Sequence, residues 1–134
     1  MDKDWIHSLV SRVASGSLLA EPFFAAMDCD AALDARDSDP AFEQAWAELL
    51  ADVDRHWATA DVAAADRALA EHLRHQAFLA ASRATGQHEI ASQVSDDFDL
   101  IVRGRLAGLG GHPFLMSLWR AYDAGDFPTP PLDG

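Results

Sequence analysis

A helical repeat of apolar residues follows the dipeptide Asp39-Pro40, and it constrains the fold more than any other part of the sequence. Aspartate before proline is a typical helix start, because the carboxylate caps exposed backbone N–H groups and proline suits the first turn. The apolar residues that follow share one stripe at helical spacing: Phe42, Trp46, Leu49, Leu50, Val53 and Trp57. The pattern predicts an amphipathic helix with both tryptophans in the core.

The same periodicity recurs along the chain, and no segment alternates convincingly as a strand does. Further helices are expected from Trp5 to Val13, from Pro22 to Met27, from about Asp61 to Thr85 with a stop at Gly86, and from Pro113 to a stop at Gly125. The aspartate-rich stretch 28–40 breaks the pattern and predicts a fraying helix end followed by a loop. We expect an all-α fold, a single compact bundle of five or six short to medium helices. Residues 1–127 would form this domain, and residues 128–134 a Pro-rich extended tail.

The segment 88–105, "HEIASQVSDDFDLIVRGR", combines a histidine, a glutamate and three aspartates with a basic end. It predicts a short helical turn from His88 to Val94, then a helix capped by Ser95. Aspartates in the first turn of that helix would be stabilised by the helix dipole. Asp99 and Arg103 are four apart and are expected to pair along the surface.

A row of polar side chains, His72, Gln76 and Arg83, flanks the apolar side of the predicted helix 61–85. Buried polar groups need partners. If the helices on either side of Gly86 pack antiparallel, this row would face Asp97 or Glu89. We therefore predict an Arg83–Asp97 contact that locks the two helices together. The same geometry, slightly open, would form a polar pocket lined by His72, Arg83, His88, Glu89 and Asp97.

The formal net charge of −12, from 22 acidic and 10 basic residues, bounds the possible partners. It repels phosphate backbones and anionic membranes, and it favours solubility or a basic protein partner. A helix-turn-helix interpretation of residues 87–105 would present Asp96, Asp97 and Asp99 to DNA, which would be strongly repulsive. We therefore expect no nucleic-acid or membrane partner.

The lone Cys29 cannot form an internal disulfide, which favours a reducing compartment and a buried structural thiol. The first residues lack the pattern of a signal peptide, and no apolar run is long enough to span a membrane. A cytoplasmic location is expected.

Metal and catalytic motifs are incomplete. His-Glu-x-x-His and Gly-x-Ser-x-Gly do not occur. His72 and His75 are three residues apart on one helix, about 60° apart in rotation, which suits them poorly as ligands of one metal. No cofactor, metal site or catalytic residue is predicted.

These observations favour a non-catalytic, acidic helical module that binds another protein, as an inhibitor of or adaptor for a basic partner. The alternative is a small-molecule or metal-dependent enzyme that uses a pocket around His72, Arg83, His88 and Asp97. A third possibility is a homo-oligomer, with Phe78 and the Pro-rich tail as contact points.

Overall fold

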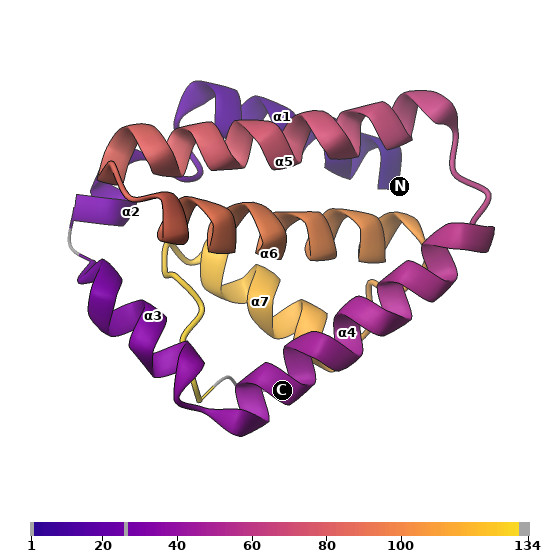
Figure 1. Cartoon of the computed structure of the whole chain (residues 1–134). Helices are drawn as coiled ribbons and strands as arrows, with labels where there is room; N and C mark the ends of the chain where they lie inside the picture. The colour runs from indigo at the N-terminus through magenta and orange to yellow at the C-terminus, as the bar shows by residue number, and fades with distance from the viewer. Residues whose placement is uncertain (1, 26, 132–134) are drawn as a thin grey trace.

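The computed structural model describes residues 2–25 and 27–131, with the side chains of residues 4–25 and 27–131. This part of the chain forms seven α-helices and no strand, which confirms the all-α prediction with one or two more helices than expected. The helices are α1 (Asp2–Ser15), α2 (Glu21–Ala25), α3 (Cys29–Asp37), α4 (Pro40–Thr59), α5 (Ala64–Thr85), α6 (His88–Leu106) and α7 (Pro113–Asp123). Figure 1 shows their arrangement.

The central element is α6, which packs against α5, α4, α7 and α1. Ten of its 19 residues are buried, whereas a helix at the surface buries only one stripe. A left-handed Gly86, with φ of 66°, ends α5 and turns the chain so that α5 and α6 run side by side in opposite directions (Figure 1). On α6, Gly104 lets α7 approach closely, because a Cβ there would overlap Leu115 Cδ1. The core is therefore assembled around α6.

The start of α4 is the one that the sequence predicts. Asp39 Oδ1 accepts a hydrogen bond from the backbone N–H of Phe42 at 2.9 Å, and Pro40 occupies the first turn. Phe42, Leu49 and Val53 are buried, while the two tryptophans of the stripe are half-buried. From this start α4 runs diagonally toward the C-terminal end of α6, and α3 and α4 spread apart from the turn that joins them (Figure 1).

The prediction of a fraying helix end and a loop over residues 28–40 is wrong, because residues 29–37 form the separate helix α3. Asp28 caps this helix by accepting from Ala31 N at 3.1 Å. Its buried residues follow helical spacing: Cys29, Ala32, Leu33 and Arg36. The stripe is inconspicuous in the sequence, since two of its members are small and one is an arginine. The aspartates between them lie on the exposed side of the helix.

The predicted break at Ser95 is also wrong. α6 runs without interruption from His88 to Leu106, and Ser95 is buried inside it. The predicted pair of Asp99 and Arg103 is confirmed, with Arg103 Nη2 2.8 Å from Asp99 Oδ2. Arg103 Nη1 also lies 2.8 Å from Asp54 Oδ1 on α4. Arg103 therefore links neighbouring turns of α6 through Asp99 and links α6 to α4 through Asp54.

Residues 124–131 form no helix. Phe127 and Pro128 are nevertheless buried, and the ring centroid of Phe127 lies 5.0 Å from the guanidinium carbon of Arg36 on α3. This segment therefore lies against the buried side of α3, where Arg36 also contacts Phe42 of α4. The rest of the predicted tail, residues 132–134, lies outside the described residues. Within the described part of the chain, no helix combines the length and apolarity needed to cross a bilayer.

Candidate functional site

A buried carboxylate, Asp97 on α6, is the centre of the largest polar network in the core. Arg36 from α3 donates two hydrogen bonds to it, Nη1 to Oδ2 at 2.7 Å and Nη2 to Oδ1 at 2.9 Å. The indole Nε1–H of Trp46 on α4 donates to Oδ1 at 2.8 Å, and the hydroxyl of Tyr122 on α7 donates to Oδ2 at 2.7 Å. Asp97 is 0% exposed and Arg36 5%. We call these four residues the Asp97 lock, because they join α3, α4, α6 and α7 through one carboxylate.

The electrostatics of the lock are balanced internally. Burial alone lowers the pKa of Arg36, but the charge and hydrogen bonds of Asp97 outweigh it and leave this pKa raised. Arg36 therefore keeps its positive charge, and a paired, hydrogen-bonded ion pair is the form in which two buried charges are tolerated. The guanidinium carbon of Arg36 also lies 4.6 Å from the ring centroid of Phe42, which adds a cation–π contact.

Tyr122 should make stability depend on alkaline pH. Burial and the charge of Asp97 raise the pKa of Tyr122 well above its ordinary value of about 10. Above about pH 10 the unfolded phenol loses its proton while the folded one keeps it, so the free energy of unfolding falls as pH rises. We expect urea unfolding between about pH 8 and 11 to show that the free energy of unfolding falls more steeply with pH in the wild type than in Tyr122→Phe. The difference in slope should reach up to about 1.4 kcal/mol per pH unit. Tyr122 is the only tyrosine of the chain, so equal slopes in the two proteins would contradict its place in the lock.

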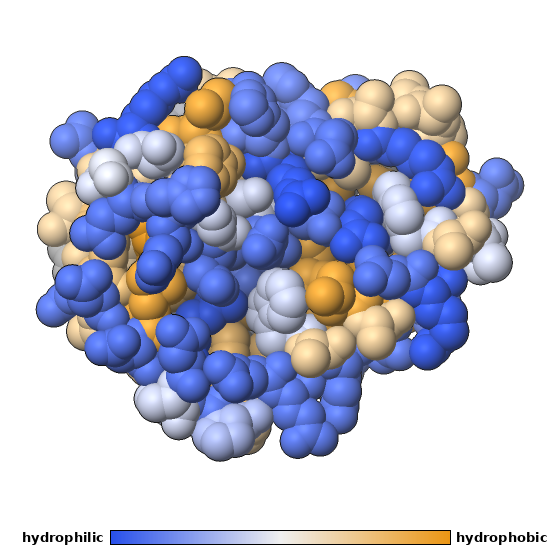
Figure 2. Space-filling model, in the orientation of Figure 1, coloured by the Kyte–Doolittle hydropathy of each residue, from blue (hydrophilic) through white to orange (hydrophobic). Residues whose placement is uncertain are grey.

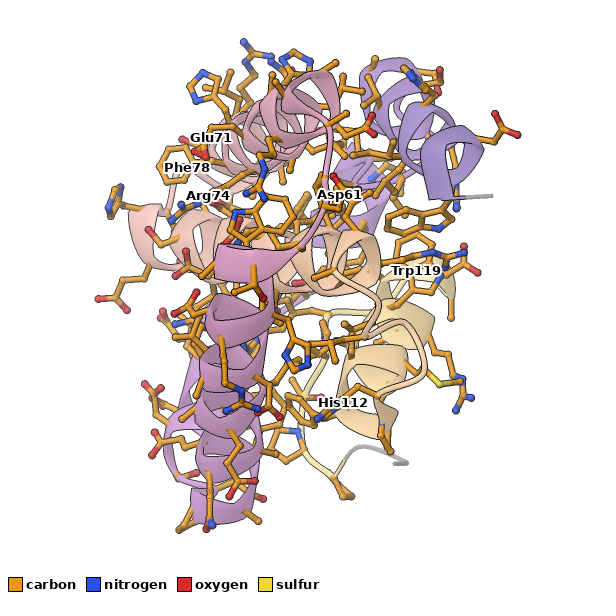
Figure 3. The ribbon with its side chains drawn as sticks, turned by 90° about the vertical axis from the view of Figure 1, so that its right-hand side faces the viewer. Asp61, Glu71, Arg74, Phe78, His112 and Trp119 are labelled. Carbon is orange, nitrogen blue, oxygen red and sulfur yellow. The ribbon has the colours of Figure 1, made fainter. Side chains whose placement is uncertain are left out.

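The predicted contact between Arg83 and Asp97 is wrong, because Asp97 is bound by Arg36 and Arg83 is exposed. The reason is helix register. Arg83 lies three residues before the Gly86 turn and Asp97 eleven after it. At 1.5 Å per residue, antiparallel helices therefore separate them by roughly 12 Å along the axis. The arginine of α5 that reaches α6 is Arg74, labelled in Figure 3, which binds Asp96 Oδ1 at 3.2 Å.

The predicted polar pocket does not form. His72, His88 and Glu89 are exposed, Gln76 is half-buried, and Asp97 is sealed in the core. Phe78, labelled in Figure 3 and predicted as an oligomer contact, is half-buried and meets the ring of His88 edge-on at 5.4 Å. In the described residues, no three histidine, cysteine, aspartate or glutamate side chains converge as a metal would require. Cys29 is buried as predicted, and burial followed by the charges of Asp30 and Asp28 raises the pKa of its thiol.

Beside the lock, the surface opens into a recess between α3, α4 and α6, with a volume of about 270 Å³. We call it the α4 recess. It is lined by Arg36, Asp37, Phe42, Glu43, Trp46, Gln93 and Asp96. Its walls are the two aromatic residues Phe42 and Trp46, one turn apart on α4, and carboxylates from all three helices surround them. Burial raises the pKa of the half-exposed Asp96, and Arg74 partly opposes this shift.

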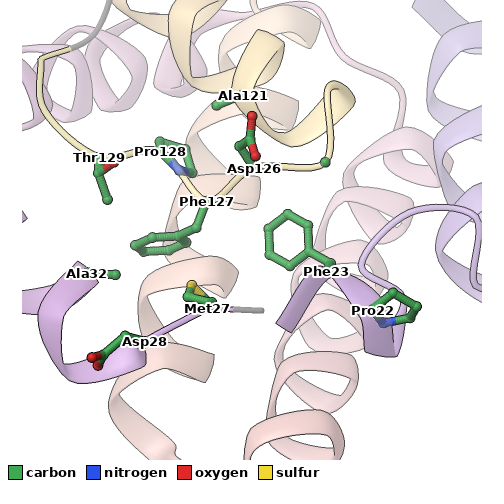
Figure 4. Close-up of a pocket in the computed structure, with 11 residues that line it drawn as sticks. Pro22, Phe23, Met27, Asp28, Ala32, Ala121, Asp126, Phe127, Pro128 and Thr129 are labelled. Atoms are coloured by element: carbon green, nitrogen blue, oxygen red, sulfur yellow. The ribbon is translucent and has the colours of Figure 1, made fainter. Parts of the chain in front are cut away.

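A second, wider groove of about 530 Å³ lies at the N-terminal end of α3, between α2 and the segment after α7 (Figure 4). Phe23, Met27 and Phe127 form its apolar part, and Asp28 and Asp126 stand at its edge. α3 is thus bordered by two hollows, each with aromatic and acidic residues.

The acidic residues concentrate on the same part of the molecule. Residues 28–48 contain seven acidic residues and one basic residue, so their formal charge is −6, half of the −12 of the whole chain. We call their exposed carboxylates the acidic face; they belong to Asp28, Asp30, Asp34, Asp37, Glu43 and Glu48. The one basic residue, Arg36, is buried in the lock and leaves the face uncompensated. Figure 2 shows hydrophilic residues over most of the side that carries α3 and α4, with small apolar patches between them.

The sequence did not predict the Asp97 lock or the acidic face, because it did not predict the helix α3. Had residues 29–37 been recognised as a helix, Arg36 would have fallen on its apolar stripe, which is a signal for a buried, paired arginine. Its partner is 61 positions away, and no spacing rule connects the two.

The comparisons with known proteins agree with a binding role. No curated protein matches the chain. A family model described as "Immunity protein PIM1" matches residues 8–129, which include α3, the acidic face and all four residues of the lock. The match covers most of the 134 residues, and an immunity protein acts by interaction with another protein. The chain belongs to the PIM1 immunity protein family.

Proposed function

We propose that this protein neutralises a cognate toxic protein by binding a basic surface of that protein with its acidic face. The family match supports the class of function. The observation that supports this binding surface is the concentration of half the net charge on α3 and the first half of α4. Surface charge of one sign accelerates association with an oppositely charged partner and discourages wrong partners.

The structure of α3 and α4 supports this use of the face. The charges stand on two helices that the Asp97 lock joins to α6 and α7 through hydrogen bonds of 2.7–2.9 Å. A surface that is already ordered before binding loses less conformational entropy when the partner arrives. The two hollows beside α3 offer places where side chains of the partner can be buried among the charges. Buried anchors of this kind carry most of the affinity of typical protein interfaces.

The partner can be identified by capture from a lysate of the source cells at low salt, about 50 mM, where screening is weak. Immobilised wild-type protein should retain one basic protein that salt elutes. The purified partner should then bind the purified wild-type chain directly, and it should be toxic when expressed without it. Recovery of nothing specific, or a partner that is harmless when expressed alone, would contradict the proposed function.

A further inference from the structure

The α4 recess has the dimensions and walls of a site for one long side chain. Its volume of about 270 Å³ falls just below the roughly 300–1,000 Å³ of pockets that hold drug-sized ligands. Phe42 and Trp46 provide the apolar walls, and Asp37 and Glu43 stand at the opening as exposed residues of α3 and α4. An aromatic wall with carboxylates at the opening accepts the stem and the charged head of a long basic side chain.

The charge of the recess is negative once its internal pairs are taken into account. The charge of Arg36 at its base is balanced by Asp97, and Arg74 balances part of the charge of Asp96. Asp37 and Glu43 have no ion-pair partner in the described part of the chain. Two carboxylates therefore remain uncompensated at the opening, next to the aromatic rings.

Guanidinium fits this environment better than ammonium, because it is planar, stacks on aromatic rings and pairs with carboxylates through several N–H groups. The chain itself uses the same combination. Arg36 contacts the ring of Phe42 while it binds Asp97, and the guanidinium carbon of Arg103 lies 5.9 Å from the ring centroid of Trp57 while Arg103 binds Asp99.

We propose that the α4 recess receives one arginine side chain of the partner protein, with the guanidinium against Phe42 and Trp46 and paired with Asp37 and Glu43. This inference rests on the proposed function, which requires a basic partner but does not say where it is anchored. The lock prepares the site in advance, since Asp97 fixes the indole of Trp46 and Arg36 packs on Phe42. The arginine is thereby predicted to be a binding hot spot within a larger charged interface.

The test uses the full chain and Nα-acetyl-arginine amide as a probe, followed by NMR of the tryptophan indole N–H groups. The four tryptophans give four indole signals, of which Trp46 alone lines the recess. We expect a saturable shift of the Trp46 signal at millimolar probe. The neutral isostere Nα-acetyl-citrulline amide should leave it unchanged, and Nα-acetyl-lysine amide should bind more weakly than the arginine probe. An unmoved Trp46 signal, an equal response to citrulline, or tighter binding of lysine would overturn the inference.

A pair of matched variants separates the recess from general electrostatics. Asp37→Asn/Glu43→Gln removes two negative charges that line the recess. Asp34→Asn/Glu48→Gln removes two negative charges from the same helices outside the recess. Each variant therefore changes the formal net charge of the chain from −12 to −10. The first should weaken the arginine probe by about tenfold or more, whereas the second should change its affinity by less than about threefold. Equal losses in the two variants would overturn the inference.

The captured partner distinguishes failure of this inference from failure of the proposed function. If the wild-type chain binds the partner and both variants lose the same affinity, the neutralising interaction stands and the arginine site is wrong. If the wild-type chain binds no toxic partner, the proposed function fails whatever the arginine probe shows. A loss of partner affinity in Asp37→Asn/Glu43→Gln that the other variant does not show supports both the neutralising function and the arginine site.

Discussion

Replacement of Asp97 by asparagine is expected to lower the free energy of unfolding by about 3–5 kcal/mol, the cost of removing one member of a buried ion pair. Arg36 would keep its charge, since guanidinium stays protonated in proteins, and with 5% of its surface exposed this charge would be buried without a carboxylate to balance it. Trp46 and Tyr122 donate to different oxygens of Asp97, so with asparagine one of them would keep a neutral acceptor and the other would face an NH2 group that cannot accept. Urea unfolding of the two proteins measures the difference directly.

The neighbouring variant Asp96→Asn is the matched control. It makes the same chemical change on the same helix, but the Arg74–Asp96 pair is 42% and 41% exposed and its N–O distance is 3.2 Å. Exposed ion pairs contribute about 0–1 kcal/mol, and burial already raises the pKa of Asp96, so its loss should cost less than about 1 kcal/mol. Similar losses in the two variants would show that the lock does not hold the fold as described.

Charge reversal on the acidic face is expected to weaken partner binding by about 100-fold or more, since like charges brought together at an interface cost several kcal/mol. The variant is Asp34→Lys/Glu43→Lys/Glu48→Lys, and all three side chains are exposed. Because exposed substitutions change stability little, the fold should be retained. Isothermal titration with the purified partner measures the affinity, and the wild-type affinity should fall steeply as salt is added.

Asp61→Lys/Glu71→Lys/Glu89→Lys provides the control for net charge. Both variants change the formal charge from −12 to −6, and both include one glutamate from the first turn of a helix. Asp61, Glu71 and Glu89 lie outside residues 28–48, so this control should lose little affinity beyond the effect of net charge. If the two triple variants lost the same affinity, the acidic face would not be the binding surface.

Local signals in the sequence predicted the fold well where they were strong. The capping of α4 by Asp39 and the stop at Gly86 are both present in the structure, because each depends on residues within one turn. The predicted helix 61–85 corresponds to α5, which begins three residues later. α3 was not predicted because its buried stripe contains only one large apolar residue, Leu33, beside two small residues and an arginine, and because aspartates lie on its exposed side.

The candidate site depends on pairings across the chain, which no local rule supplies. The sequence predicted an arginine partner for Asp97 but assigned that role to Arg83, and the predicted start of a helix at Ser95 placed Asp97 in a first turn. In the continuous α6 it is at the centre, where Arg36, Trp46 and Tyr122 meet it from 61, 51 and 25 positions away. The basic partner that the acidic balance favours stays a prediction, and the helices that carry half of the charge are defined only by the structure.

The most direct test of the account is protection of cells from the captured partner. The partner is expressed in a host alone, with the wild-type chain, with Asp34→Lys/Glu43→Lys/Glu48→Lys, and with the control Asp61→Lys/Glu71→Lys/Glu89→Lys, and growth is measured. Neutralisation through the acidic face predicts that the wild-type chain and the control restore growth, whereas the variant of the acidic face does not. Failure of the wild-type chain to protect, or full protection by the variant of the acidic face at equal protein level, would contradict it.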